Sequence, residues 1–301
     1  MIEVKDLHKS YDKGKVSALN GLTFSVGEGE VFGVIGPDGA GKSSLFRILA
    51  SLLLPDSGTA VMNGHDVVKD YRRVRQIIGY MPGRFSLYQD LSVEENLAFF
   101  ATLFNTTIEE NYHLIKDIYQ QIEPFKKRRA GALSGGMKQK LALSCALIHK
   151  PEILILDEPT TGVDPVSRKE FWDMLGRLKE QGITILVSTA YMDEASRCDR
   201  IALIREGVFI ASDTPQGIID HYAERLWSVE GSRMSALLKA LRNHTAVKTS
   251  FAFGDKIHIT VTEGLQTGEL KQYLAEKEFG EVHIAPIKPT VEDCFMALTS
   301  E

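Results

Sequence analysis

The sequence has few cysteines, no long apolar run and no apolar N-terminal segment. Its three cysteines, Cys145, Cys198 and Cys294, are odd in number and far apart, which excludes a disulfide-held scaffold and favours a reducing compartment. No apolar run approaches the roughly 18 residues that a membrane-spanning helix needs, and residues 1–7 do not resemble a secretory signal. We therefore expect a cytoplasmic chain that reaches a membrane only through a partner.

Positive charge is also scarce for a protein that binds nucleic acid. The 35 Lys and Arg residues are outnumbered by 40 Asp and Glu residues, which gives a formal charge of −5. This sign opposes binding through the neutralisation of phosphates, and the basic run Lys126–Arg129 is more typical of a solvated face than of a partner site. We expect no nucleic-acid partner. The composition, 44% hydrophobic and 25% charged, is that of a folded globular protein.

Short apolar runs that are followed by glycine or acidic residues indicate an α/β core. Val31–Ile35 leads into a glycine-rich segment, and apolar residues at helical spacing follow from Leu45 onwards. Two further apolar runs, Ile153–Leu156 and Ile183–Val187, have the length and the bounds of strands that are buried on both faces. The pattern predicts a parallel sheet with helices packed around it.

The region from about residue 85 to about residue 148 has a different pattern and predicts a helical subdomain inserted into this core. Ser92 and Glu95 have the spacing of a capping box, and apolar residues continue one helical face through Phe104. A second helix is expected over residues 108–122.

Beyond residue 215 the pattern changes to the order βαββαβ. Strands are expected at residues 226–229, at residues 247–261 as a pair around Gly254, and at residues 282–287. Helices are expected at residues 234–241 and 270–274 and from Val291 onwards. This order predicts a small α+β domain of the ferredoxin-like type over residues 224–301, after a first domain over residues 1–218.

The glycine-rich segment matches the pattern GxxxxGK[ST], which binds the phosphates of nucleotides. Its glycines allow backbone N–H groups to surround phosphate oxygens at the start of a helix, whose dipole favours an anion. We expect Lys42 to contact the β and γ phosphates of ATP and Ser43 to bind Mg²⁺. The expected nucleotide-binding residues of this segment are Gly36, Pro37, Asp38, Gly39, Ala40, Gly41, Lys42, Ser43 and Ser44.

Two adjacent carboxylates, Asp157 and Glu158, follow the apolar run that begins at Ile153. Carboxylates at the end of a buried strand are costly unless a cation or hydrogen bonds compensate them. Beside a phosphate-binding loop, Asp157 is expected to support Mg²⁺, and Glu158 is expected to polarise a water for attack on the γ phosphate. The alternative is a pair of solvated carboxylates where a strand leaves the sheet.

Four motifs, in their order along the chain, resemble those of the ATP-binding subunit of an ABC transporter. They are the glycine-rich loop, LSGGMKQ at residues 133–139, ILILDEP at residues 153–159 and TGVDP at residues 161–165. The resemblance covers about the first 215 residues and implies an ABC-type P-loop NTPase that hydrolyses ATP. The C-terminal part, with PTVED at residues 289–293, resembles the small domain of ABC-2 export ATPases.

The resemblance also implies the roles of further residues and the partners of the chain. Tyr11 would stack on adenine, and Asp164 would communicate across a dimer with a second ABC ATPase domain. The signature residues Ser134, Gly135, Gly136 and Met137 would act on the γ phosphate of a nucleotide that the opposite domain holds.

Membrane-spanning permease subunits are the other implied partners, and they would hold the chain at the inner face of the membrane. The helical subdomain and the loop Arg84–Tyr88 resemble the family's coupling surface. This loop displays Phe85, Leu87 and Tyr88, and exposed side chains of this kind often mark interfaces. We expect the permease subunits to bind there; the alternative is that these side chains pack the helical subdomain onto the core.

The chain departs from the family's pattern at two sensor positions. Gly83 stands where the family has a glutamine that contacts Mg²⁺, and Ala190 stands where it has a histidine that touches the γ phosphate. Asp38 adds a negative charge where asparagine or serine is usual. Two interpretations stay open. In one, the chain hydrolyses ATP through Glu158 despite these losses; in the other, it is a structural half that hydrolyses little and completes the ATP site of another domain.

Overall fold

The computed structural model describes residues 1–299, and the chain divides into two compact units between Thr214 and Pro215. The sequence predicts a first domain that continues to residue 218. In the structure, helix α7 (Pro215–Asp220) packs instead against helix α10 (Val291–Leu298) of the second unit. Within residues 1–299, no helix combines the length and the apolar character that crossing a bilayer requires.

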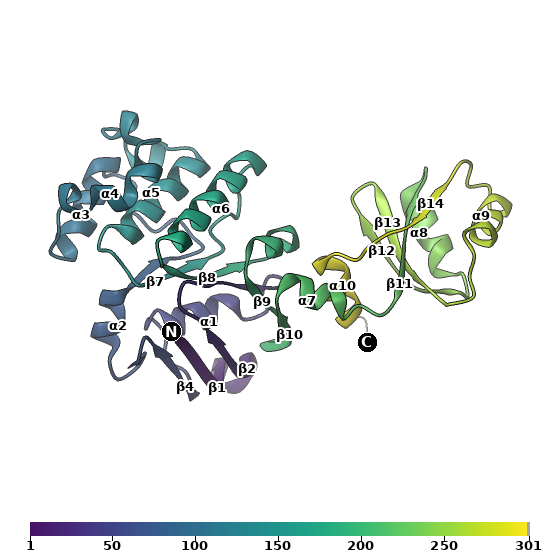
Figure 1. The fold of residues 1–301 in the computed structure, drawn as a ribbon, viewed down its shortest axis with the longest axis horizontal. Coiled ribbons are helices and arrows are strands. Elements are labelled where there is room, and N and C mark those ends of the chain that lie inside the picture. The colour runs from purple at the N-terminus through teal and green to yellow at the C-terminus, as the bar shows by residue number, and fades with distance from the viewer. Residues whose placement is uncertain (300–301) are drawn as a thin grey trace. The chain divides into compact units, whose positions relative to one another are not determined.

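A six-stranded sheet forms the centre of the first unit (Figure 1). Its strands are β3 (Val31–Ile35), β6 (Ile78–Met81), β7 (Ile153–Asp157), β8 (Thr184–Thr189), β9 (Arg200–Arg205) and β10 (Val208–Asp213). They lie in the order β10-β9-β3-β8-β7-β6, and β10 alone runs antiparallel to its neighbour. Every residue of β3, β7 and β8 is buried, as their unbroken apolar runs predict. The predicted α/β class is confirmed.

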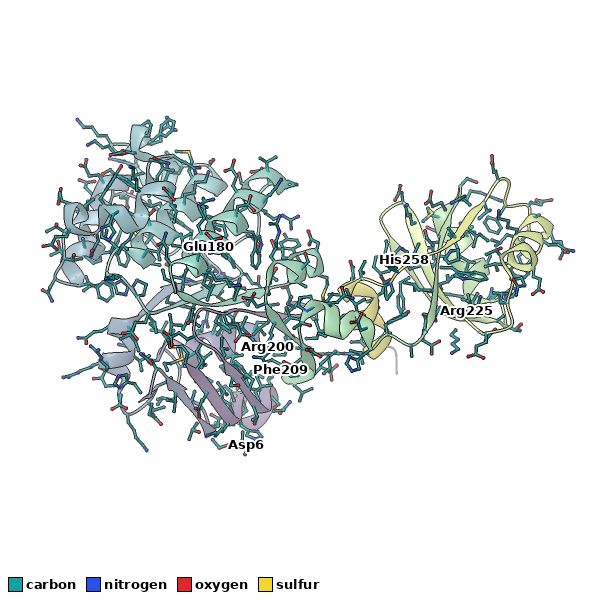
Figure 2. The ribbon with its side chains drawn as sticks, viewed as in Figure 1. Asp6, Glu180, Arg200, Phe209, Arg225 and His258 are labelled. Carbon is teal, nitrogen blue, oxygen red and sulfur yellow. The ribbon has the colours of Figure 1, made fainter. Side chains whose placement is uncertain are left out.

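A second, antiparallel sheet packs on helix α1 (Lys42–Leu49). Its strands are β1 (Ile2–Tyr11), β2 (Val16–Val26), β4 (Ser57–Met62) and β5 (His65–Asp66), in the order β2-β1-β4-β5, and the 3-10 turn η1 (Asp12–Gly14) joins β1 to β2. Because α1 also contacts β7, it lies between the two sheets. Phe209 of β10 meets Phe24 of β2 with 5.3 Å between ring centroids, and Figure 2 shows Phe209 with Arg200 at this edge. The apolar pattern of residues 1–26 predicts no strand.

Helices α3 (Val93–Leu103), α4 (Ile108–Tyr119) and α5 (Gly135–Leu147) pack together where the sequence predicts a helical subdomain (Figure 1). The predicted capping box starts α3, since the Glu95 N–H donates to Ser92 Oγ at 3.2 Å and the Ser92 N–H donates to Glu95 Oε2 at 2.7 Å. Helix α4 ends three residues before the predicted end at residue 122. The remaining helices of the unit are α2 (Tyr71–Ile77), α6 (Pro165–Glu180) and the 3-10 helices η2 (Glu123–Phe125), η3 (Ala130–Ala132) and η4 (Met192–Arg197).

The second unit has the predicted βαββαβ order. Its elements after α7 are β11 (Arg225–Glu230), α8 (Met234–Arg242), β12 (Val247–Phe253), β13 (Lys256–Val261), α9 (Thr267–Glu276), β14 (His283–Pro286) and α10. The strands form an antiparallel sheet in the order β12-β13-β11-β14, and its apolar residues build a separate core with α8 and α9. His258 of β13, labelled in Figure 2, contacts Asp293 of α10 through Nδ1 and Oδ1 at 2.7 Å.

Candidate nucleotide-binding site

The glycine-rich loop joins β3 to α1 and lies close against neighbouring backbone. Gly41 has a φ of +107°, which side chains rarely permit. A Cβ atom on Gly36 would lie 2.2 Å from the carbonyl oxygen of Ile204, and one on Gly41 would lie 2.2 Å from that of Ala18. Both positions therefore require glycine. The loop ends at the N-terminus of α1, where free N–H groups and the helix dipole favour a phosphate.

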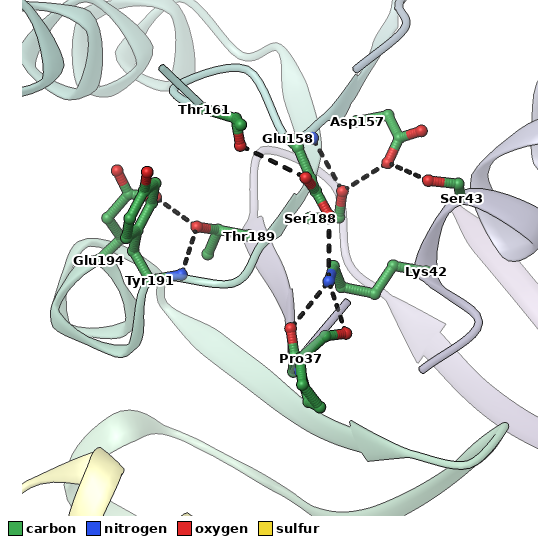
Figure 3. A network of polar contacts seen from close by, with 11 residues as sticks. Pro37, Lys42, Ser43, Asp157, Glu158, Thr161, Ser188, Thr189, Tyr191 and Glu194 are labelled. Carbon is green, nitrogen blue, oxygen red and sulfur yellow. Dashed lines mark hydrogen bonds and ion pairs between the residues drawn. The ribbon is translucent and has the colours of Figure 1, made fainter. Parts of the chain in front are cut away.

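Lys42, the first residue of α1, folds back over this loop (Figure 3). Its side chain is 3% exposed, and its ammonium donates hydrogen bonds to the carbonyl oxygens of Gly36 at 2.8 Å and Pro37 at 3.0 Å. The same ammonium forms an ion pair with Glu158 Oε1 at 3.0 Å. The structure thus brings the predicted phosphate-binding cation and the predicted base into direct contact.

Asp157 ends β7 and is buried, with 3% of its surface exposed. Its Oδ1 accepts hydrogen bonds from Ser188 Oγ at 2.8 Å and from Ser43 Oγ at 3.2 Å (Figure 3). Burial raises the pKa of Asp157, and these two hydrogen bonds offset part of the rise. This contact is consistent with the expectation that Ser43 and Asp157 both bind Mg²⁺.

Glu158 follows β7 in the left-handed region, with a φ of +48°. Its N–H donates to both the hydroxyl and the carbonyl oxygen of Ser188, at 2.9 and 3.1 Å. Thr161 Oγ1 donates to Glu158 Oε2 at 3.3 Å. The two adjacent carboxylates therefore point in different directions, Asp157 toward Ser43 and Glu158 toward Lys42 (Figure 3). Neither is a freely solvated group.

The donors around Asp157 suit Mg²⁺ better than they suit a transition metal. Mg²⁺ prefers hard oxygen ligands and is commonly held by one or two carboxylates together with the phosphates of a substrate. The carboxylate of Asp157 and the hydroxyl of Ser43 are such ligands. Within residues 1–299, no group of three or more His, Cys, Asp and Glu residues could hold a metal ion. The residues present fit a magnesium ion that arrives with a nucleotide.

Tyr11 lies at the end of β1, beside the start of α1. Its hydroxyl is 3.0 Å from Ser44 Oγ, and the residue is 37% exposed. The structure thus places an accessible aromatic ring next to the phosphate-binding loop, as the predicted stacking on adenine requires.

The signature residues form a separate feature at the start of α5. Ser134 caps this helix by accepting a hydrogen bond from the Met137 N–H at 3.4 Å. A Cβ atom on Gly136 would lie 2.8 Å from Ser167 Oγ, so this segment is close to the start of α6. Among the described residues, Ser134 has no hydrogen bond to the loop that holds Lys42.

Asp164 caps helix α6. It accepts hydrogen bonds from the N–H groups of Val166 at 3.1 Å and Ser167 at 3.0 Å. The hydrogen bond from the Ser167 N–H is the main reason that the pKa of Asp164 is lowered. Asp164 and the signature residues therefore lie on adjoining helix starts.

The two departures from the family's pattern flank the acidic pair. Gly83 follows β6, and a Cβ atom there would lie 3.1 Å from the carbonyl oxygen of Asp157. Ala190 follows β8, the other neighbour of β7. Both positions are therefore at the correct edge of the sheet, but neither supplies a polar side chain. Asp38 is exposed on the loop.

Polar residues at the end of β8, which no sequence motif indicates, also belong to the site. Ser188 contacts both members of the acidic pair. Glu194, which is 4% exposed, accepts hydrogen bonds from Thr189 Oγ1 at 2.6 Å and Thr160 Oγ1 at 3.1 Å. The only signal for these contacts was a serine and a threonine at a predicted strand end, a pattern that carries no chemistry until the strand order is known.

A cavity of about 700 Å³ lies between α1, β6 and the helical subdomain. It is lined by apolar residues of α3 and α5, by Leu87 and by two guanidinium groups, those of Arg47 and Arg75. Of the three residues expected to be displayed on the nearby loop, Tyr88 is 52% exposed and Phe85 is partly buried under Lys138. Leu87 is buried, so the expectation that it is displayed is wrong.

Known proteins resemble the chain over its whole length. Residues 19–161 match the protein family described as ABC transporter. The probable multidrug ABC transporter ATP-binding protein YbhF of Escherichia coli strain K12 is 36% identical over 304 residues, which cover 99% of this chain and 52% of YbhF. The doxorubicin resistance ATP-binding protein DrrA of Mycobacterium tuberculosis strain H37Rv is 32% identical over 312 residues, which cover 100% of this chain and 94% of DrrA.

A solved structure extends the comparison to the fold. The dimeric post-hydrolysis structure of the ATP-binding cassette MJ0796, bound to ADP and Pi, has 25% sequence identity and a TM-score of 0.65, and the match covers 71% of this chain and 98% of that one. The chain spans about half the length of YbhF and nearly all of DrrA. Because the identity to DrrA extends over almost the full length of both proteins, this chain belongs to the ABC transporter ATP-binding proteins, a family of ATPases.

Proposed function

We propose that this chain is the ATP-binding subunit of an export-type ABC transporter, that its own ATP site hydrolyses slowly, and that it completes the ATP site of a second ABC ATPase domain. One contrast carries the proposal. Gly83 and Ala190 lie beside the acidic pair without a polar side chain, whereas the signature residues at the start of α5 are intact. The residues proposed to act on a partner's nucleotide are preserved, whereas two polar side chains that the chain's own site would use are absent.

The loop and the acidic pair would contact different parts of MgATP. Lys42 would bind the β and γ phosphates, Tyr11 would stack on adenine, and Ser43 and Asp157 would hold Mg²⁺. The bound ion would neutralise charge on the phosphates. Glu158 would act as the base that polarises the attacking water. Without polar side chains at residues 83 and 190 the site lacks two electrostatic groups, each worth about 10² to 10³ in rate at comparable sites.

A second ABC ATPase domain is the first proposed partner. Ser134, Gly135 and Gly136 have no hydrogen bond to the chain's own phosphate-binding loop within residues 1–299, so their N–H groups and hydroxyl suit the nucleotide of another domain. The MJ0796 cassette is dimeric, and YbhF is almost twice as long as the segment that matches this chain. The partner domain could lie on a separate chain or on the same polypeptide.

A membrane-spanning permease subunit is the second proposed partner, and it would hold the chain at the cytoplasmic face of the membrane. The cavity beside α3 offers an apolar floor and two guanidinium groups, of Arg47 and Arg75. A helix with an apolar face and a carboxylate fits this chemistry. The ring of Tyr88 packs edge to face on that of Phe99, with 5.0 Å between the ring centroids, and extends the apolar surface beyond the cavity.

One observation favours the alternative, a subunit that hydrolyses its own ATP. Glu158 is present, and it lies within 3.0 Å of the lysine that would bind the phosphates. The base and the phosphate-binding cation are therefore intact even though the flanking groups are absent.

The rate of ATP hydrolysis by the purified chain distinguishes the two. We expect slow turnover by the unmodified chain, and a rise of at least about 10² in the variant Gly83→Gln/Ala190→His, which restores both polar side chains. Ala190→His alone is a second variant, because a side chain at position 83 must make room near the Asp157 carbonyl oxygen. Adding Glu158→Gln to the double variant should remove the gain and thereby assign it to this site. Brisk, Glu158-dependent turnover by the unmodified chain as a homodimer contradicts the proposal.

A further inference from the structure

Ser188 is a fully buried residue of β8 that lies directly opposite Asp157 of β7 in the sheet register. Its hydroxyl makes two hydrogen bonds. It donates to Asp157 Oδ1 at 2.8 Å and accepts from the Glu158 N–H at 2.9 Å (Figure 3). One hydroxyl group therefore contacts both members of the acidic pair, and it makes no other hydrogen bond within the described part of the chain.

The two residues that Ser188 holds each need an external restraint. Asp157 is buried, and its other hydrogen-bond donor is Ser43, which is itself expected to turn toward Mg²⁺. Glu158 has a left-handed backbone, a conformation that persists in a residue other than glycine only where the surroundings hold it. Among residues 1–299, the Glu158 N–H donates only to the hydroxyl and the carbonyl oxygen of Ser188.

The neighbouring strands offer no substitute for this hydroxyl. Gly83 after β6 has no side chain, and Ala190 after β8 has only a methyl group. If position 188 served packing alone, alanine would fill it equally well, since the hydroxyl directs both of its bonds to the acidic pair. The groups around a metal ligand orient it, and their loss commonly weakens metal binding.

We propose that Ser188 is a positioning residue that orients the Asp157 carboxylate toward the Mg²⁺ site and fixes the backbone of Glu158. This inference rests on the proposed function, in which Asp157 supports Mg²⁺. Ser188 does not touch the nucleotide in this proposal. It acts only through the two acidic residues.

The test measures binding of a fluorescent ATP analogue to the full chain as a function of Mg²⁺ concentration. In Ser188→Ala, the Mg²⁺ concentration for half-maximal binding should rise about 10- to 100-fold, the usual cost of losing a group that orients a metal ligand. Binding in EDTA should not change, since Lys42 and the loop are untouched. Hydrogen exchange at the Glu158 amide, followed by NMR without nucleotide, should become faster.

Two further variants test whether the loss of this particular hydroxyl group causes the change. Ser188→Thr keeps the hydroxyl and should restore the Mg²⁺ dependence. Ser144→Ala is the matched control, because Ser144 is equally buried and its hydroxyl donates to the Lys140 carbonyl oxygen at 2.8 Å, inside α5. It should leave the Mg²⁺ dependence and the Glu158 exchange unchanged.

Each contrary result has a distinct meaning. Ser188→Ala with the Mg²⁺ dependence of the unmodified chain overturns the positioning role, even if its melting temperature falls, because packing alone would then explain the residue. Ser188→Thr that behaves like Ser188→Ala also overturns it. An unmodified chain that binds the analogue with no Mg²⁺ dependence contradicts the proposed magnesium site itself, and the role of Ser188 fails with it.

Discussion

At the scale of single residues, Lys42 tests nucleotide binding most directly. In Lys42→Ala we expect affinity for a fluorescent ATP analogue to fall roughly 10- to 100-fold, because a charged donor to phosphate is lost. The domain should stay folded with a lower melting temperature, because the carbonyl oxygens of Gly36 and Pro37 and the partly exposed Glu158 lose a donor. Equal affinities of the unmodified chain and the folded variant would show that Lys42 does not bind the phosphates.

The sequence predicts residues whose chemistry depends on near neighbours in the chain, and it misses contacts between distant segments. Lys42 and Asp157 could be singled out because each belongs to a short motif with fixed spacing. The ion pair of Lys42 with Glu158 joins residues 116 positions apart, and Ser188 on β8 reaches Asp157 on the neighbouring strand β7. Such contacts depend on the strand order. The burial of Leu87 also depends on how helices pack, which a local pattern does not determine.

At the scale of secondary-structure elements, the start of α5 is the part that we expect to act on a partner. Ser134→Ala should reduce ATP hydrolysis at the partner's site in a mixed assembly, because it removes both the helix cap and the hydroxyl that we propose contacts the partner's phosphate. The reduction should be on the order of 10², typical of one electrostatic group at a transition state. Steady-state hydrolysis by the mixed assembly, with this chain's own site disabled by Glu158→Gln, measures it.

The matched control for Ser134→Ala is a cap in the same subdomain. Ser92→Ala removes the cap of α3 at a comparable cost, about 0.5–2 kcal/mol of stability. It should lower the melting temperature without changing hydrolysis at the partner's site. If the two variants reduce hydrolysis equally, loss of helix stability is the cause and the signature has no separate role.

Elements with a strong internal pattern were the ones that the sequence could predict. The apolar runs that became β3, β7 and β8 are buried on both faces, and the capping box at Ser92 fixes the start of α3. The antiparallel strands β1 and β2 carry no such pattern, because their residues alternate irregularly between buried and exposed and the register shifts along the pair. The packing of β2 and β4 on α1 places their sheet in the fold.

At the scale of the whole molecule, the surface around Tyr88 should determine whether the chain joins a transporter. Tyr88→Asp places a charge on an exposed apolar surface beside the cavity, and we expect at least a 10-fold loss of co-purification with the permease subunits, on the order of what one interface hot spot contributes. Binding of ATP should be unchanged, because within residues 1–299 the hydrogen bonds and ring contact of Tyr88 go to Leu91, Asn96 and Phe99 and not to the phosphate-binding loop.

The control for Tyr88→Asp is Val208→Asp, a charge at an exposed apolar residue on β10, away from the cavity lining. It should co-purify like the unmodified chain. Unfolding of Tyr88→Asp in thermal melts would indicate that the ring serves to pack the helical subdomain, and normal co-purification would place the permease contact elsewhere.

The ion pair between Lys42 and Glu158 gives the proposed site a built-in order of events. The ammonium is a single positive charge, and the Glu158 carboxylate and a phosphate group would compete for it. In the proposed function, a phosphate that replaces Glu158 on Lys42 would release the carboxylate in the same step. The base would then be free to turn toward water only when a phosphate is present for that water to attack. Arrival of the substrate and release of the base would be one exchange of partners at a single nitrogen atom.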